Sequence, residues 1–231
     1  MASLPGKPAL DPESTTILVT GASGHIAGHI VNEALKLGYK VRGTARTQEK
    51  CEKTKKIYDN PKYSTVIVSD FSKPSHEIED AVKGVQSVMM VASDTTFSDD
   101  AEQVIGGVVA GVEAFLKAAA KQESVKRFTL TKYFIDVIDG TGLHLCAAVL
   151  DDTLEKERIF AFAGPFNWNM AIDAIGRVRP DCTAKLEKDP NEQRDLSKVP
   201  NDLGAHLLKK WYGQEGYKSF DESLKENLER V

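Results

Sequence analysis

Short apolar runs alternate along the first part of the chain with longer stretches in which apolar residues recur every three or four positions. Runs rich in β-branched residues and bounded by turn residues predict five strands, at 15–20, 39–45, 63–69, 85–92 and 126–131. Helical periodicity covers residues 25–37 and 99–121, and a charged stretch that ends at Tyr58 is also predicted to be helical. Apolar strands separated by helices predict a parallel sheet with helices on both faces.

The pattern from residue 133 onward is less regular. It predicts an extended stretch and a short strand, at 133–138 and 157–163, and four helices, at 143–150, 168–178, 202–212 and 219–229. Asn167 is a candidate N-cap for the second of these helices. We therefore expect three regions, namely a flexible lead at 1–14, a nucleotide-binding core at 15–132, and the remnant of a substrate region with a small helical cap at 133–231.

The composition excludes several classes of protein. Of the 231 residues, 41% are hydrophobic and 28% are charged, which is ordinary for a soluble globular domain. The formal net charge is −4 without any basic run, so nucleic acid is not an expected partner. The longest apolar runs are too short to cross a bilayer, and the first residues lack the apolar segment of a secretory signal. Three widely spaced cysteines, Cys51, Cys146 and Cys182, argue against a disulfide framework, so we expect a cytoplasmic protein without membrane contact.

The strongest motif is VTGASGHIAGH at 19–29, which runs from a predicted strand through a turn into a predicted helix. Gly21 permits the tight turn, Gly24 lets the main chain approach a pyrophosphate, and the small side chain of Ala27 lets the helix pack on the strand. The free N–H groups at the start of the helix can bind phosphate oxygens. The motif predicts a dinucleotide site in a Rossmann-type fold, and a glycine-rich turn without a ligand is the alternative.

The end of the second predicted strand indicates which dinucleotide binds. Sites for NAD usually place an acidic residue there, which binds the 2′-hydroxyl of the ribose. This chain has Thr44 and, two positions on, Arg46, whose guanidinium can pair with the 2′-phosphate of NADP. Lys50 or Lys53 could add positive charge. The sequence therefore favours NADP, and the alternative is that Arg46 is a solvated surface residue.

These features lie in a chain that resembles the extended short-chain dehydrogenases/reductases, in the branch of dihydroflavonol reductases, cinnamoyl-CoA reductases and fungal aldehyde or ketoreductases. The segments that carry the resemblance are VTGASGHIAGHIVNEALKLGYKVRGTAR (19–46), SDF (69–71), VAS (91–93), VKRFTLT (125–131), YFIDVIDGTGLHLCAAV (133–149) and RIFAFAGPFNWN (158–169). The resemblance implies that Asp70 hydrogen-bonds near the adenine with Phe71 beside it, and that residues 91–93 line the cofactor. The expected cofactor-binding residues are Gly21, Ala22, Ser23, Gly24, His25, Ile26, Arg46, Lys50, Asp70, Phe71, Val91, Ala92 and Ser93.

A block that the family carries is missing from this chain. In the family, the segment matching FTLT (128–131) is followed by a catalytic Ser or Thr and then by a long stretch that ends in Tyr-x-x-x-Lys. Here Thr131 is joined almost directly to a segment that resembles a later part of the family, YFIDVIDG (133–140). We therefore expect a fold that is truncated in the middle, without the catalytic helix and the next strand.

The missing block removes the family's usual proton donor. A tyrosine and a lysine four positions apart share one helix face, where the ammonium favours ionisation of the phenol that gives a proton to the carbonyl. Only Tyr58 and Lys62 have this spacing, but Asn60 and Pro61 between them disfavour a helix. We also expect this pair at the edge of the sheet opposite the cofactor. Thr131 and Tyr133 are left as candidate catalytic residues.

No metal site is expected. His25 and His29 have a spacing that can bind zinc, but no third ligand is evident in the sequence. Surface or cofactor-adjacent histidines explain the pair without a metal.

Three interpretations of the function stay open. The first is a catalytically impaired NADP-dependent reductase of small-molecule carbonyl compounds, which we would expect to act in specialised metabolism. The second is a non-catalytic NADP-binding protein that acts as a sensor or partner, and the third is a degenerate or mis-spliced product. Because the missing helix would cover the sheet beside the fifth strand, we expect apolar surface near Phe128 and Leu130, or an unpaired strand edge. We therefore also expect self-association into homo-oligomers or poor solubility of the isolated chain.

Overall fold

The computed structural model describes residues 5–92, 101–130, 136–154, 157–165, 167–180, 187–192 and 198–228. The chain forms two compact units, each built from two separate stretches of sequence. The first unit consists of Met1–Thr131 and His144–Glu157, and the second of Lys132–Leu143 and Arg158–Val231.

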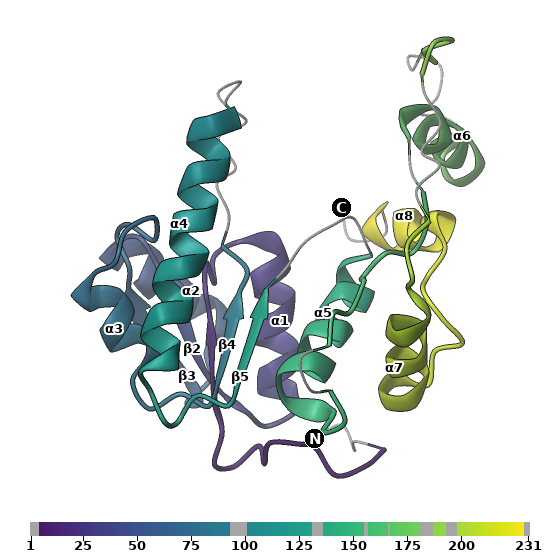
Figure 1. The fold of residues 1–231 in the computed structure, drawn as a ribbon. Helices are drawn as coiled ribbons and strands as arrows, with labels where there is room; N and C mark the ends of the chain where they lie inside the picture. Colours follow the sequence, from purple (N-terminus) through teal and green to yellow (C-terminus); the bar gives the residue numbers. More distant parts are fainter. Residues whose placement is uncertain are drawn as a thin grey trace. The chain divides into compact units, whose positions relative to one another are not determined.

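The first unit contains a parallel sheet of five strands (Figure 1). The strands are β1 (Thr16–Val19), β2 (Lys40–Ala45), β3 (Tyr63–Ile67), β4 (Ser87–Met90) and β5 (Arg127–Leu130). All five were predicted from the sequence, with bounds slightly wider than those observed. Their order across the sheet is β3-β2-β1-β4-β5, and all neighbouring strands are parallel. The winding of the chain therefore reverses between β1 and β4, and open α/β sheets bind ligands beyond the carboxyl ends of the strands at such a point.

Helices cover both faces of this sheet, as the sequence predicted (Figure 1). They are α1 (His25–Lys36), α2 (Gln48–Tyr58), α3 (His76–Val82) and α4 (Ala101–Ala120). The helices α3 and α4 pack against each other over one face, and α1 and α2 lie on the other. The short helix α3 was not predicted. It begins at Ser75, whose hydroxyl accepts a hydrogen bond from the N–H of Ile78, and its seven residues are too few to show a clear apolar repeat.

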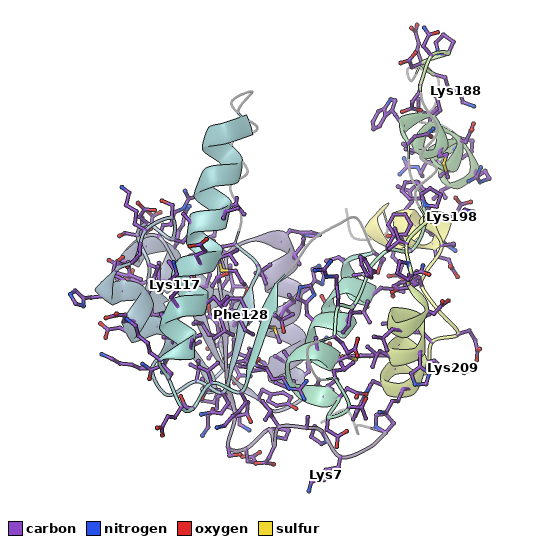
Figure 2. The ribbon with its side chains drawn as sticks, viewed as in Figure 1. Lys7, Lys117, Phe128, Lys188, Lys198 and Lys209 are labelled. Carbon is purple, nitrogen blue, oxygen red and sulfur yellow. The ribbon has the colours of Figure 1, made fainter. Side chains whose placement is uncertain are left out.

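The core of the first unit follows from the alternation of side chains along β1. Leu18 faces a cluster of buried residues from β4, α3 and α4, whereas Ile17 and Val19, also buried, point to the opposite face. Burying one such side chain stabilises the fold by about 1.5–3 kcal/mol. Phe128 of β5, labelled in Figure 2, packs partly against the same cluster. It is therefore not a fully exposed apolar surface, and self-association of the chain stays a prediction.

The segment that returns to the first unit ends in a π-helical turn, η1 (Cys146–Leu150), which packs against β4 and β5. The N-terminal lead was expected to be flexible, but part of it is held by this turn. The N–H of Ala9 donates to the carbonyl of Leu150 over 2.9 Å, and the N–H of Leu10 donates to the carbonyl of Val149 over 3.0 Å. The lead thus satisfies carbonyl groups that the end of a helical segment leaves without partners.

The second unit is helical. It contains most of α5 (Val137–Leu145) together with α6 (Trp168–Val178), α7 (Asp202–Tyr212) and α8 (Phe220–Leu228). The predicted helices at 168–178 and 202–212 are confirmed, and the carboxamide oxygen of Asn167 caps α6 by accepting from the N–H of Met170 over 2.9 Å. The predicted helix at 143–150 corresponds to the end of α5 and to η1. Within the described residues, no helix combines the length and the apolar character that crossing a membrane requires.

Two predictions for this part of the chain were wrong. The extended stretch predicted at 133–138 ends too late, because Val137 and Ile138 already belong to α5; residues 133–135 lie outside the described part. The strand predicted at 157–163 does not form. Its carbonyl groups bind side chains instead of a neighbouring strand: the hydroxyl of Tyr217 donates to the carbonyl of Phe160 over 2.8 Å, and the carboxamide of Asn201 donates to that of Phe162 over 2.6 Å.

Candidate functional site

The turn between β1 and α1 has the conformation that its glycines permit. Gly21 has φ +66°, in the left-handed region, and a Cβ at this position would lie 3.2 Å from the Cβ of Ala92. Gly24 is the N-cap residue of α1, and its main chain is extended. The first turn of α1 contains no acidic residue, and no side chain caps its N–H groups. The start of α1 is therefore electrostatically suited to an anion such as a phosphate.

Hydrogen bonds from two neighbouring strands hold this turn in place. At the end of β2, the hydroxyl of Thr44 accepts from the N–H of Gly21 and its carbonyl accepts from the N–H of Ala22, both over 3.0 Å. On the other side, the hydroxyl of Thr20 accepts from the N–H groups of Val91 and Ala92, each over 2.9 Å. The turn is thus fastened at the carboxyl ends of the three central strands.

A cavity of about 390 Å³ opens beside this turn, entirely within the first unit. Its size falls in the range of about 300–1,000 Å³ that is usual for small-molecule sites. Ten of the expected cofactor-binding residues line it, namely Gly21, Ser23, Gly24, His25, Ile26, Arg46, Lys50, Phe71, Val91 and Ala92. The other lining residues are Thr20, Ala27, Thr44, Ala45, Val68 and Phe115.

The remaining expected residues do not line the cavity or lie outside the described part of the chain. Ala22 is buried behind the turn, with 1% of its surface exposed. Asp70 binds its own neighbours: its carboxylate accepts from the hydroxyl and the N–H of Ser72 and pairs with Lys73. The hydrogen bonds from Ser72 lower the pKa of Asp70. Ser93 lies outside the described residues.

Positive charge and apolar surface meet at this cavity. Arg46 and Lys50 are both exposed, and neither forms an ion pair with an acidic side chain in the part of the chain that is described. Phe71 and the buried Phe115 also line the cavity and add aromatic side chains to it. A ligand with an apolar ring and several negative charges would fit this combination.

Phe115 could not be recognised as a cavity residue from the sequence. It lies on the apolar stripe of α4, where it is indistinguishable from other core positions, and it reaches the cavity only because α4 crosses the sheet beside β4. Tyr58 was also missed. We expected Tyr58 and Lys62 at the edge opposite the cofactor, but for Tyr58 this was wrong, because its hydroxyl donates to the carbonyl of Ala22 in the glycine turn over 2.7 Å.

Tyr58 and Lys62 do not form a catalytic pair. The ammonium of Lys62 donates to the carbonyl of Gly38 over 2.8 Å and pairs with Glu13 over 3.1 Å, away from the turn that Tyr58 contacts. The candidates Thr131 and Tyr133 lie outside the described residues. His25 and His29 lie with their ring centroids 5.1 Å apart. Among the described side chains, no group of three or more potential metal ligands is found.

A parallel sheet of this order, with a glycine turn and a cavity at the point where its winding reverses, defines a dinucleotide-binding protein of the Rossmann type. A profile of a family described as NAD(P)H-binding matches residues 21–152, which is more than half of the chain. The chain is 37% identical to ketoreductase adrE of Penicillium roqueforti over 329 positions, with 95% of this chain and 97% of the relative covered. The chain therefore belongs to the NAD(P)H-binding family, as an extended short-chain dehydrogenase/reductase-like protein related to fungal ketoreductases.

Two further comparisons are consistent with this family. The chain is 37% identical over 164 positions to NADPH-dependent methylglyoxal reductase GRE2 of Saccharomyces cerevisiae, which covers 68% of this chain and 44% of the relative. The crystal structure of Gre2 from Candida albicans in complex with NADPH has a TM-score of 0.62 at 18% identity, with 94% of this chain and 98% of that chain covered. At this identity the similarity shows a shared fold.

The chain is shorter than its relatives. It spans about half the length, or less, of several curated relatives that it matches, from 38% to 52%. The alignment with ketoreductase adrE is longer than the 231 residues of the chain, so part of that relative has no counterpart here. The absence of the family's catalytic block in particular stays a prediction.

Proposed function

We propose that this chain binds NADP(H) in the cavity beside the β1–α1 turn, and that on its own it does not efficiently reduce carbonyl compounds. One observation carries the first part of the proposal. The glycine turn lies around the same cavity as Arg46 and Lys50, two cations that form no ion pair with an acidic side chain among the described residues. The turn suits a pyrophosphate, and the cations suit the additional phosphate that distinguishes NADP from NAD.

The end of β2 favours NADP for a second reason. An NAD site would need an acceptor there for the 2′-hydroxyl of the ribose. The residue in question, Thr44, is buried, and its hydroxyl already accepts the N–H of Gly21. Arg46 follows on the exposed side of the same strand end. The name of the yeast relative, an NADPH-dependent methylglyoxal reductase, supports the same choice.

The relatives also support a substrate class, small-molecule aldehydes or ketones, as their names state. Catalysis needs a proton donor near the carbonyl oxygen. In the one Tyr-x-x-x-Lys sequence of the chain, the hydroxyl of Tyr58 donates to the glycine turn, whereas the ammonium of Lys62 donates to the carbonyl of Gly38. We therefore favour a protein that holds NADP(H) without efficient turnover. A working reductase is the second candidate, favoured by the match to nearly the whole of ketoreductase adrE.

Titration calorimetry with NADP⁺, NADPH and NAD⁺ tests the cofactor assignment. We expect both forms of NADP to bind more tightly than NAD⁺. Arg46→Ala should remove most of this preference, at a cost of about 1–3 kcal/mol in the binding of NADP. Lys56→Ala is the control, because it removes one cation from α2, the helix that follows Arg46, at a position that does not line the cavity. Equal affinities for NADP⁺ and NAD⁺, unaffected by Arg46→Ala, would contradict the proposal.

A further inference from the structure

Tyr58 contacts the glycine turn through the main-chain carbonyl of Ala22. Its side chain extends from the last turn of α2, and its hydroxyl donates a hydrogen bond to the carbonyl of Ala22 over 2.7 Å. Ala22 is buried, whereas the next four residues, 23–26, are exposed and line the cavity. The hydrogen bond therefore acts on the point where the turn passes from the protein interior to the cavity.

Two glycines make room for this contact. A Cβ at Gly28 would lie 3.4 Å from the hydroxyl of Tyr58. A Cβ at Gly43 would overlap the hydroxyl of Tyr63 and lie 2.6 Å from the Cβ of Ala22. The rings of Tyr58 and Tyr63 meet edge to face, with centroids 4.6 Å apart. Gly43 stands within β2, where glycine weakens a strand unless another group approaches closely. The close approach of Tyr63 and Ala22 explains why a glycine occupies this position.

The hydroxyl of Tyr58 acts as a donor over the whole physiological range of pH. Burial, together with the neighbouring Tyr63, raises the pKa of Tyr58 to about 12. The phenol is therefore protonated near pH 7, and its proton is directed at a main-chain carbonyl. This is unlike the catalytic tyrosine of a reductase, which needs a lowered pKa to pass its proton to a substrate.

The carbonyl of Ala22 and the N–H of Ser23 belong to one peptide group. In a planar trans peptide these two bonds point in opposite directions. A donor that fixes the carbonyl on the interior side therefore also fixes the N–H of Ser23 away from Tyr58, and Ser23 lines the cavity. Thr44 holds the preceding peptide group through the N–H of Ala22.

We propose that Tyr58 is a positioning residue for the phosphate site: it fixes the peptide group between Ala22 and Ser23 so that the N–H of Ser23 faces the pyrophosphate of the bound dinucleotide. This inference rests on the proposed function. The hydroxyl of Tyr58 should therefore contribute to the affinity for the pyrophosphate and should not contribute to the affinity for the 2′-phosphate.

Fragments of the cofactor separate these two contributions. ADP has a pyrophosphate and no 2′-phosphate, and 2′-AMP has a 2′-phosphate and no pyrophosphate. Tyr58→Phe keeps the ring and removes the hydroxyl. We expect this substitution to weaken the binding of ADP and NADP⁺ by about 3- to 10-fold, which is the effect of one lost hydrogen bond. The affinity for 2′-AMP should stay unchanged. Arg46→Ala should instead weaken the binding of 2′-AMP and leave the binding of ADP unchanged.

Tyr39→Phe is a matched control. The hydroxyl of Tyr39 also donates to a main-chain carbonyl, that of Leu10 over 3.0 Å, but Tyr39 does not line the cavity. It should leave the binding of all three nucleotides unchanged. If Tyr58→Phe weakens ADP and 2′-AMP equally, its role is general stability and the proposal is overturned. No weakening of ADP overturns it as well.

Amide hydrogen exchange without any nucleotide gives a second readout. The N–H groups of Ala22 and Gly24 are hydrogen-bonded within the turn, to Thr44 and Gly21. They should exchange faster in Tyr58→Phe than in Tyr39→Phe, and unchanged rates would overturn the proposal whatever the nucleotides do. If the unmodified chain binds none of the three nucleotides, the proposed function fails, and these rates alone decide whether Tyr58 orders the turn.

Discussion

The hydroxyl of Thr44 accepts a hydrogen bond from the N–H of Gly21 over 3.0 Å. This bond joins β2 to the first residue of the glycine turn, which has a φ of +66°. Thr44 is 5% exposed, so water does not readily replace the hydroxyl. Thr44, near the end of β2, therefore supports the turn.

We expect Thr44→Val to destabilise the fold and to weaken nucleotide binding. Valine has nearly the same shape but cannot accept the N–H of Gly21, and the loss of one such partly buried hydrogen bond costs about 0.5–1.5 kcal/mol. Urea unfolding and calorimetry measure the two effects. Thr54→Val is the control, because the hydroxyl of Thr54 is also buried and donates to the carbonyl of Cys51 in α2, not to the glycine turn. Equal nucleotide affinities for the two variants would contradict this role of Thr44.

Gly111→Ala is expected to weaken nucleotide binding through Phe71. A Cβ on Gly111 would lie 2.5 Å from Cδ2 of Phe71 and 2.9 Å from its carbonyl oxygen, so the ring that lines the cavity must move. We expect an affinity loss of a few-fold, as for a displaced apolar contact worth about 1 kcal/mol. Fluorescence or calorimetric titration with NADPH measures it.

Gly106→Ala on the same helix is the control for this substitution. Among the described residues, no atom outside its chain neighbours and the backbone of its own helix lies within 4 Å of a Cβ at Gly106. Alanine should therefore stabilise α4 by up to about 1 kcal/mol through helix propensity alone, without any change in affinity. If both variants bind NADPH as the unmodified chain does, the position of Phe71 does not matter for binding.

The sequence predicted the parts of the site that are contiguous along the chain. Residues 21–26 follow from the strand–glycine–helix pattern, because the same local geometry makes both the motif and the turn. Phe115 and Tyr58 were not predicted, because their side chains reach the site through the packing of α4 and α2. The strand expected at 157–163 failed for a related reason: side chains from Asn201 and Tyr217, distant in sequence, take its carbonyl groups.

In the second unit, a buried carboxylate, Asp136, caps the start of α5. It accepts hydrogen bonds from the hydroxyl of Ser223 and from the N–H groups of Ile138 and Asp139, and the ammonium of Lys218 lies 3.8 Å away. Burial raises the pKa of Asp136, but these hydrogen bonds, with the charge of Lys218, outweigh it, so the pKa lies below its usual value. A depressed pKa stabilises the fold above the pKa of the unfolded chain, about 3.9, and this contribution is lost as the pH falls through the folded-state pKa.

We expect Asp136→Asn to destabilise the fold by about 1–3 kcal/mol at pH 7, because it removes a hydrogen-bonded charge. The difference from the unmodified chain should begin to narrow below about pH 4, where Asp136 becomes protonated in the unfolded chain, and should continue to narrow as the pH falls through the lower folded-state pKa. Neighbouring Asp139 acts with the opposite sign, since burial raises its pKa, but it is present in both proteins. Urea unfolding between pH 3 and 7 checks this, with the exposed Asp152→Asn as control. A difference that is independent of pH would rule out the charge of Asp136 as its cause.

The last prediction is that the chain alone shows no useful NADPH-dependent reduction of aromatic aldehydes or ketones. A reductase must hold the nicotinamide, provide a pocket for the carbonyl, and place a proton donor within about 3 Å of its oxygen. The cavity supports only part of the first requirement, a site for the phosphates of the cofactor, and it does so through residues 20–115, which lie before β5. Loss of a general acid usually lowers the rate about 10²–10⁴-fold, and misplacement of the reacting groups by about 1 Å can add a further 10²-fold.

The assay follows the absorbance of NADPH with a panel of carbonyl compounds, and the background rate without protein is the reference. The described tyrosine with the family's spacing, Tyr58, donates to the carbonyl of Ala22 and has a raised pKa, so it is unsuited to act as the proton donor. If turnover is nevertheless observed, Tyr133→Phe is the decisive variant. Turnover that this substitution abolishes would contradict the prediction and would place an unorthodox active site next to the end of β5. Turnover that survives both Tyr133→Phe and Tyr58→Phe would instead require a donor other than these two tyrosines.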